Sequence, residues 1–229
     1  MSELFLTILV PVLNRPKNVD RFVNSFLQNT PLNKARILFI TGQDCHEEIQ
    51  AIRSCQGPID FQIVPPDILS WAKRINWGFN YLNSINSECS WALCGADDIV
   101  FHPNWLEIAE KASENFCGII GTNDLGHPAC ISGSHTTHPI VSREYVSKHG
   151  TIDELNKFCH EGYHHNYVDV EFVSTAKKRN MWKHESSCII EHLHPSWNKA
   201  SWDDVYQKGK DNWENDKQLW VKRSQLFRL

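Results

Sequence analysis

The sequence lacks the features that mark secreted, membrane and repeat proteins. It has no internal repeat, no low-complexity tract and no C-x-x-C pair among its 8 cysteines, so we expect reduced thiols rather than a disulfide framework. No run is long and apolar enough to cross a bilayer, and the apolar start at residues 4–13 lacks the basic flank of a signal peptide. The sequence therefore predicts a cytoplasmic protein without a transmembrane segment.

An excess of positive charge is also missing. The net charge of -4 does not favour a surface devoted to DNA. A local basic patch would have to come from Lys177, Lys178, Arg179 and Lys183. The 229 residues are enough for one domain, which we place at residues 1–200, followed by a helical tail at residues 201–229 that packs on it.

The first half of the chain alternates apolar runs with helical patterns. We expect buried strands at residues 4–12, 35–41, 60–66, 90–96 and 117–124, separated by helices at residues 19–27, 47–54, 71–85 and 104–113. Asn18 and Ser70 are the expected caps of the first and third of these helices. Such an alternation with short connections predicts an α/β fold with a mostly parallel sheet flanked by helices.

The pattern is looser after residue 125. Residues 126–139 look like a histidine-rich loop, and we expect helices at residues 142–148 and 169–179 and a strand at residues 186–195. In the tail, Trp213, Trp220 and Phe227 are spaced by seven, which predicts one apolar stripe on a long helix. That stripe either packs on the domain or forms a face for an acceptor or a second copy.

Two neighbouring carboxylates, Asp97 and Asp98, end the apolar strand at residues 90–96. Adjacent like charges cost free energy unless they are solvated or a cation balances them. Polar residues also follow the other expected parallel strands: Asn14 and Arg15, Asp44, and Asn123 and Asp124. Because ligands bind at the carboxyl ends of such strands, these residues predict one site, at which the doublet would hold Mg²⁺ or Mn²⁺.

Several stretches, in this order, resemble a GT-A glycosyltransferase of the family-2-like kind. They are "TILVPVLNRPKNVDRFVNSF", "ILFITGQD", "WAKRINWGFNYL", "CGADDIVFHPNWLE", "YVDVEFVSTAKKRN" and "CIIEHLHP", and they span roughly residues 4–200. The resemblance implies a Rossmann-like GT-A fold with a C-terminal helical extension. It also implies transfer of a sugar from a nucleotide-diphosphate donor to an acceptor hydroxyl, with Mn²⁺ or Mg²⁺ as cofactor.

The resemblance assigns roles at the donor side of the site. Asp97 becomes the carboxylate that faces the sugar or ribose, and Asp98 becomes the metal ligand of a DxD-like element whose first position is Ala96 here. Either His192 or His194 would complete the metal shell, because both would point to one face of a strand. The implied nucleotide-binding residues are Pro11, Val12, Asn14, Arg15, Asp44, Arg74 and Asn76.

The resemblance also implies an inverting reaction, in which a carboxylate takes the proton of the attacking hydroxyl. Asp169 matches that catalytic position, and Glu171 is the neighbour that could substitute for it or orient it. Without the resemblance, acids at this place are equally well explained by the helix dipole, which favours negative charge at a helix N-terminus.

Other interpretations remain open at this point. Cys159, His160, His164 and His165 have spacing that could suit zinc. The chain could be an inactive relative that binds nucleotide or glycan, or a nucleotidyltransferase, although the first loop has no glycine for phosphate binding. The segment "EHLHPSWNKASWDDVYQKG" resembles small phage or prophage glycosyltransferases. That origin would imply the host cytoplasm, and a glycan or a modified DNA base as acceptor.

Overall fold

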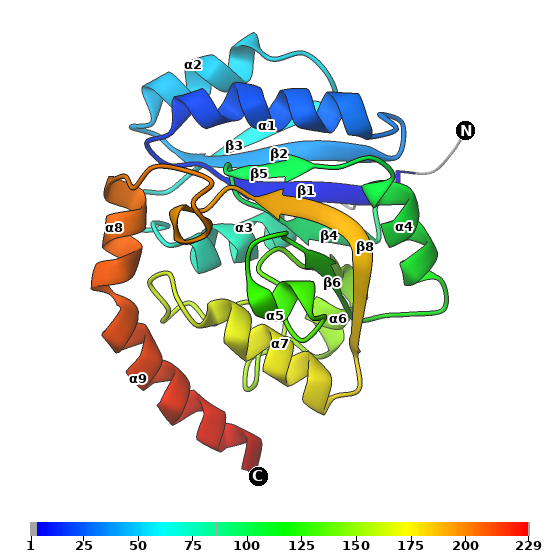
Figure 1. The fold of residues 1–229 in the computed structure, drawn as a ribbon, viewed down its shortest axis with the longest axis vertical. Coiled ribbons are helices and arrows are strands. Elements are labelled where there is room, and N and C mark those ends of the chain that lie inside the picture. The colour runs from blue at the N-terminus through cyan, green and yellow to red at the C-terminus, as the bar shows by residue number, and fades with distance from the viewer. Residues whose placement is uncertain (1–3, 86, 229) are drawn as a thin grey trace.

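The computed structural model describes residues 4–85 and 87–228, and its centre is an eight-stranded sheet with helices on both faces (Figure 1). The strands lie side by side in the order β3-β2-β1-β4-β7-β6-β8-β5. Their bounds are β1 Leu6–Pro11, β2 Ala35–Gly42, β3 Ile59–Val64, β4 Trp91–Cys94, β5 Ile99–Phe101, β6 Ile119–Asn123, β7 Ile140–Ser142 and β8 Trp182–His192. The predicted α/β fold class is confirmed.

The expected parallel arrangement holds for β3, β2, β1 and β4, and the sheet is mixed beyond them. The three-residue strand β7 inserts antiparallel between β4 and β6, so that Ile140 pairs with both Leu93 and Ile120. β8 runs parallel to β6 and then antiparallel to β5, where His192 pairs with Ile99. A strand as short as β7 shows no alternation that sequence reasoning could use.

The helices predicted up to residue 179 lie close to their expected positions, but residues 126–139, expected as a loop, contain the four-residue helix α5. They are α1 Pro16–Asn29, α2 His46–Ser54, α3 Trp71–Ser84, α4 Trp105–Ser113, α5 Pro128–Ile131, α6 Arg143–Lys148, α7 Val168–Lys178, α8 Asp204–Asp211 and α9 Trp213–Ser224, with 3-10 turns η1 Pro195–Trp197 and η2 Gln225–Arg228. Ser70 caps α3 as predicted, with its hydroxyl accepting from the Lys73 N–H. The predicted Asn18 cap is wrong, because α1 begins two residues earlier, at Pro16, whose fixed φ suits a first helical position.

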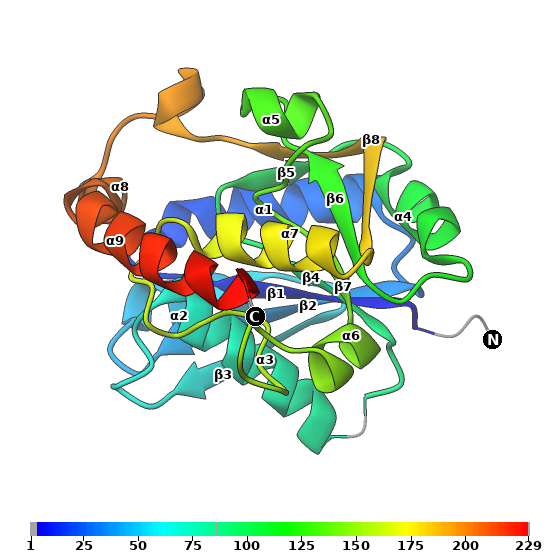
Figure 2. The same ribbon diagram turned by 90° about the horizontal axis from the view of Figure 1, so that it is seen from below.

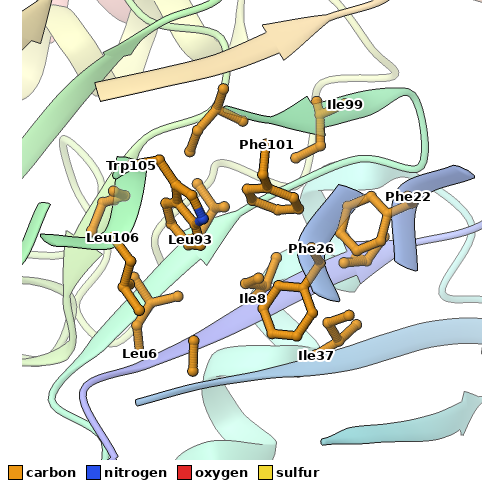
Figure 3. Close-up of a cluster of buried hydrophobic side chains, with 14 of the residues drawn as sticks. Leu6, Ile8, Phe22, Phe26, Ile37, Leu93, Ile99, Phe101, Trp105 and Leu106 are labelled. Atoms are coloured by element: carbon orange, nitrogen blue, oxygen red, sulfur yellow. The ribbon is translucent and has the colours of Figure 1, made fainter. Parts of the chain in front are cut away.

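Two apolar clusters lie on opposite faces of the sheet and fix its orientation. On one face, Leu6 and Ile8 pack with Phe22 and Phe26 of α1 (Figure 3). On the other, Leu9 belongs to the cluster beneath α3. This alternation follows from the period of two along a strand. Each of these aliphatic side chains is fully buried, which contributes about 1.5–3 kcal/mol to stability. The carboxyl ends of β1, β2 and β4 are thereby held on a rigid base.

The C-terminal tail is two helices rather than one long helix. α8 and α9 meet at Asn212, so the prediction of one long helix is wrong. Trp213 and Trp220 both lie on α9, and the Trp220 ring contacts that of Phe227 in the following 3-10 turn, with centroids at 6.3 Å. Trp220 packs against the core, whereas Trp213 is 51% exposed. Seen from below, α9 runs beside α7 (Figure 2). Among the described residues, no helix combines the length and the hydropathy needed to span a membrane.

Candidate functional site

The Asp97–Asp98 doublet lies in the turn between β4 and β5, and both residues are buried. The Arg15 guanidinium bridges them: its Nη1 is 3.3 Å from Oδ1 of Asp97 and 3.3 Å from Oδ2 of Asp98. Arg15 is the residue before α1, so the first βα connection and the β4 connection meet at one edge of the sheet. The doublet is therefore buried and paired with a guanidinium, and it is not a solvated turn.

Burial and neighbouring charges shift the pKa values of Asp97 and Asp98 in opposite directions. Burial, followed by the charge of Asp98, raises the pKa of Asp97 to about 7. Burial also acts to raise the pKa of Asp98. There, however, the charge and hydrogen bond of His192 and the Tyr206 hydroxyl hold the pKa below its usual value. Asp98 is thus the permanently ionised member of the doublet.

Asp98, His138 and His192 form a cluster whose potential ligand atoms all lie within 4.8 Å of one another. Each has a buried polar atom without a hydrogen-bond partner among the described residues: Oδ1 of Asp98, Nε2 of His138 and Nδ1 of His192. Buried polar atoms left unpaired are costly, so three of them on residues of one cluster call for a missing partner. One carboxylate and two imidazoles suit Mn²⁺ or a similar divalent cation, and these residues fit such an ion.

Sequence analysis did not identify His138, although its ring is neutral and has one nitrogen free to bind a metal. Its Nδ1–H donates to the carbonyl of Cys94 at 3.3 Å, which leaves Nε2 as the free lone pair. Burial lowers the pKa of His138 to about 4, so the ring is neutral and able to ligate. The available signal was a histidine two residues before the apolar pair Ile140–Val141. It could be used only once β7 was known to lie beside β4.

His194 does not share the face of His192, because β8 ends at His192. Instead, His194 caps the turn η1, with its Nδ1 accepting the N–H of Ser196 at 3.1 Å. Its ring packs against His192 and Tyr206, with centroids at 5.0 Å and 4.8 Å. The prediction that the two histidines lie on one face of a strand is wrong, and His192 is the one beside Asp98, at 3.4 Å.

The start of α8 lies over this site. Asp203 accepts two hydrogen bonds from Arg15, at 2.8 Å and 2.9 Å, and also caps α8 through the N–H groups of Val205 and Tyr206. Tyr206 donates to Oδ2 of Asp98 at 2.7 Å, and its ring lies 3.8 Å from the Arg15 guanidinium carbon. The tail thus places the Asp203 carboxylate against Arg15 and the Tyr206 hydroxyl against the ionised Asp98.

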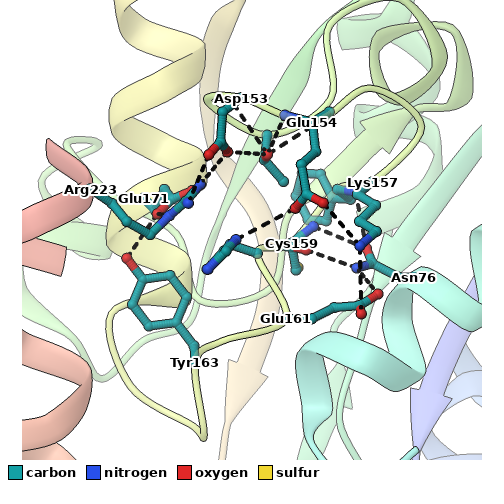
Figure 4. A network of polar contacts seen from close by, with 12 residues as sticks. Asn76, Asp153, Glu154, Lys157, Cys159, Glu161, Tyr163, Glu171 and Arg223 are labelled. Atoms are coloured by element: carbon teal, nitrogen blue, oxygen red, sulfur yellow. Dashed lines mark hydrogen bonds and ion pairs between the residues drawn. The ribbon is translucent and has the colours of Figure 1, made fainter. Parts of the chain in front are cut away.

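Two residues expected near a pyrophosphate have structural roles. Arg74 is buried in α3 and donates to the carbonyls of Val12, at 2.6 Å, and Ile68. The Asn76 side chain accepts from the N–H groups of Phe158 and Cys159 and donates to the Cys159 carbonyl (Figure 4). Both side chains hold loops in place around the site, and neither is free to receive a phosphate.

The remaining expected nucleotide contacts lie around the ends of β1 and β2. Pro11 ends β1, and Val12 is buried and donates its N–H to Ile40. Asn14 is exposed and adopts a left-handed conformation with φ 55°, which asparagine tolerates better than most residues. Asp44 is exposed in the turn after β2. Asn14 and Asp44 therefore remain available to a ligand.

Asp169 and Glu171, the two carboxylates predicted for catalysis, bind different partners. Asp169, in the first turn of α7, is 28% exposed on its side chain and receives Nε2 of His135 at 3.0 Å. Glu171 is buried and bound by Arg223, at 2.7 Å and 2.8 Å, and by the Tyr163 hydroxyl. Figure 4 shows Glu171 inside this network. The suggestion that Glu171 substitutes for Asp169 or orients it is not supported by these contacts.

The rival zinc set is not assembled. Among the described residues, His160 clusters instead with Asp153 and Glu154, and Cys159 is buried beside Asn76. The four basic residues considered for DNA are each engaged within the chain. Their partners are the Ser134 carbonyl for Lys177, the Phe227 carbonyl for Lys178, the Gly150 and Thr151 carbonyls for Arg179, and the Ala112 carbonyl for Lys183.

Comparison of the whole structure places the fold in a known class. The sequence matches no protein-family model and no curated protein. Solved glycosyltransferases do share the fold. The mannosyltransferase PcManGT from Pyrobaculum calidifontis, solved with GDP-Man and Mn²⁺, aligns with TM-score 0.63 at 11% identity over 85% of this chain and 58% of its own. The GT-A fold expected from the sequence is confirmed.

Two further structures agree. TarS from S. aureus aligns with TM-score 0.61 at 13% identity, over 82% of this chain and 59% of its own. Glucosyl-3-phosphoglycerate synthase from Mycobacterium tuberculosis, solved with Mn²⁺ and uridine diphosphate, aligns with TM-score 0.54 at 8% identity, over 83% of this chain and 72% of its own. The chain spans 58–59% of the length of PcManGT and TarS.

Proposed function

We propose that this protein is a metal-dependent glycosyltransferase that moves a sugar from a nucleotide-diphosphate donor to an acceptor hydroxyl with inversion. One observation carries the proposal: Asp98, His138 and His192, which each have a buried polar atom without a partner, bring potential ligand atoms within 4.8 Å of one another at the carboxyl edge of a GT-A sheet. Structures of this fold have been solved with GDP-Man and Mn²⁺ and with Mn²⁺ and uridine diphosphate, which supports the same ligand classes here.

The residues divide the chemistry between them. A divalent cation on Asp98, His138 and His192 would neutralise the charge that builds on the departing diphosphate. Arg15, already next to the doublet, would bind a diphosphate oxygen through its fork of donors. Asp97 would face the sugar or ribose, and Asn14 and Asp44 would contact the nucleoside. Asp169 would take the proton of the acceptor hydroxyl as that oxygen attacks the anomeric carbon.

The direct test measures nucleoside diphosphate release from a panel of uridine, guanosine and other nucleotide sugars with Mn²⁺. We expect slow donor hydrolysis with one donor class, abolished by EDTA and restored by added Mn²⁺. Binding without release from any donor, in the presence of candidate glycan acceptors, would instead identify a non-catalytic relative. Pyrophosphate made from a sugar phosphate and a nucleoside triphosphate would identify a nucleotidyltransferase. The DNA acceptor gains no support, because its four basic residues are engaged within the chain.

The contact between Asp203 and Arg15 leads to a second expectation. The Asp203 carboxylate occupies the guanidinium donors that a diphosphate would use, so the two anions compete for Arg15. We expect Asp203→Asn to tighten binding of a nucleoside diphosphate roughly threefold to tenfold, because removing one charge frees Arg15 while an asparagine still caps α8. Isothermal titration with uridine or guanosine diphosphate and Mn²⁺ measures this. Weaker binding in the variant would mean that Asp203 helps to hold the donor.

A further inference from the structure

Asp169 is paired with a histidine that the reaction, as proposed so far, does not use. Nε2 of His135 lies 3.0 Å from Oδ2 of Asp169. The two residues come from different parts of the chain, the loop after α5 and the first turn of α7. The His135 side chain is 12% exposed, against 28% for that of Asp169. His135 therefore contacts Asp169 from the protein interior, and the Asp169 side chain remains partly exposed to solvent.

The His135 ring is held before any ligand arrives. Its backbone N–H donates to the carbonyl of Ala129 at 3.0 Å, and Lys177 of α7 donates to the carbonyl of the preceding residue, Ser134. Its ring packs on His127, with centroids at 5.3 Å. His127 is fixed in turn, because its Nδ1 accepts the N–H of Ala129 at 3.1 Å. These contacts set both the position and the plane of the His135 ring.

The pairing orders the two oxygens of Asp169. Oδ2 is occupied by His135, and Oδ1 accepts the N–H of the next residue, Val170, at 2.8 Å. Since a carboxylate oxygen has two lone-pair sites, each of the two oxygens keeps one for a further proton donor. The carboxylate is therefore held at both oxygens and still has the capacity to receive a hydroxyl proton.

Two opposing effects set the charge of Asp169. Burial alone would raise its pKa and favour the neutral acid, which cannot accept a proton. The hydrogen bond and charge of His135, with a smaller contribution from His127, outweigh burial and hold the pKa of Asp169 below its usual value. Other titratable groups that interact electrostatically with Asp169 are Cys130, Cys159 and His165, and Lys177 of α7 contacts the loop at Ser134.

We propose that His135 is a positioning residue for the reaction: its Nε2–H, bound to Oδ2, holds the Asp169 carboxylate in place as the acceptor of the hydroxyl proton. This inference rests on the proposed function. In the step, the acceptor oxygen forms the bond to the anomeric carbon and the bond from that carbon to the diphosphate oxygen breaks. The hydroxyl proton passes to the Asp169 carboxylate. His135 donates to Oδ2 throughout and gives up no proton.

The test compares His135→Ala and His135→Gln in the full-length chain with Mn²⁺ and the active donor. We expect His135→Ala to lower kcat at least about 10-fold with little change in the donor KM, because Asp169 does not bind the donor. The acidic limb of kcat/KM should move to higher pH, since losing a donor to the ionised form raises the pKa of Asp169. The glutamine amide can still donate to Oδ2 of Asp169. His135→Gln should therefore keep part of the rate, and its acidic limb should lie between those of His135→Ala and the native protein.

His102→Gln is the matched control. His102 forms a similar histidine–carboxylate pair with Glu191, at 2.8 Å, outside the proposed site, and Glu191 keeps Lys199 as a partner. In His102→Gln, the acidic limb of kcat/KM should lie at the same pH as in the native protein. A rate loss in His135→Ala without any movement of the limb would mean that the histidine only supports the loop, and it would overturn the proposal.

A readout independent of turnover separates this inference from the proposed function. Titration of the ¹³C-labelled carboxyl of Asp169, assigned by its absence in Asp169→Asn, gives the pKa directly. A higher pKa in His135→Ala than in the native protein supports the positioning role, even if no donor is found. An unchanged pKa in a folded His135→Ala protein overturns it, even if the native protein is an active glycosyltransferase.

Discussion

Replacing Asp98 with asparagine is expected to lower donor turnover by about 10²–10³-fold and to abolish tight Mn²⁺ binding. Asp98 is the ionised member of the doublet, it belongs to the cluster with His138 and His192, and its Oδ1 has no hydrogen-bond partner among the described residues. An amide keeps the shape but removes the charge that a hard cation requires. Electron paramagnetic resonance of free Mn²⁺, with nucleoside diphosphate release as the activity readout, measures both effects.

Asp60→Asn is the control for this experiment. Asp60 is an exposed carboxylate of β3, the edge strand at the far end of the sheet, so its loss changes the net charge equally without touching the cluster. We expect this variant to bind Mn²⁺ like the native protein. If Asp98→Asn also binds Mn²⁺ normally, the cation is held elsewhere and the assignment of the cluster is wrong.

Replacing Arg223 with methionine is expected to destabilise the protein by about 3–5 kcal/mol, because it leaves the buried carboxylate of Glu171 without its cation. Arg223 reaches from α9 to Glu171 of α7 and also to Asp153, at 2.6 Å (Figure 4). Tyr163 donates to the same Glu171. The network thus ties the C-terminal tail to the helix that bears Asp169. Urea unfolding followed by tryptophan fluorescence gives the free energy of unfolding.

Two further variants make this prediction specific. Lys217→Met removes an exposed pair with Glu214 on the same helix, and we expect a change within about 0.5 kcal/mol. The double variant Arg223→Met with Glu171→Gln should be less destabilised than the two single variants added together, since no buried charge is left alone. Additive losses would show that the two side chains do not interact.

The layout of the fold could be predicted because its strands are long and apolar. β1 and β2 are buried on both faces, which gives continuous apolar runs, and the runs are separated by helices with clear spacing. β7 and β5 have three residues each, too few to show any period, and their pairing depends on contacts distant in the chain. The sequence could therefore predict the parallel half of the sheet but not the way its second half is ordered.

The candidate site was predictable where a polar residue comes soon after a buried apolar strand. Arg15, Asp97 and Asp98 were found in this way. His138 was missed because its partner strand was not recognised, and His135 because nothing in its loop marks a contact with α7. Asp203 and Tyr206 reach the site from the start of α8, which the sequence analysis did not separate from the rest of the tail. Arg74 and Asn76 show the opposite error, since a motif-like pattern turned out to fix loops by hydrogen bonds to backbone groups.

The most direct measurement is an anomalous difference map of crystals grown with Mn²⁺ and a nucleoside diphosphate. The expected result is a single strong peak between Asp98, His138 and His192, completed by diphosphate oxygens, with Tyr206 displaced from the carboxylate it now contacts. A map with no peak there, in which the nucleotide binds while Asp98 keeps its hydrogen bond from Tyr206, would contradict the account.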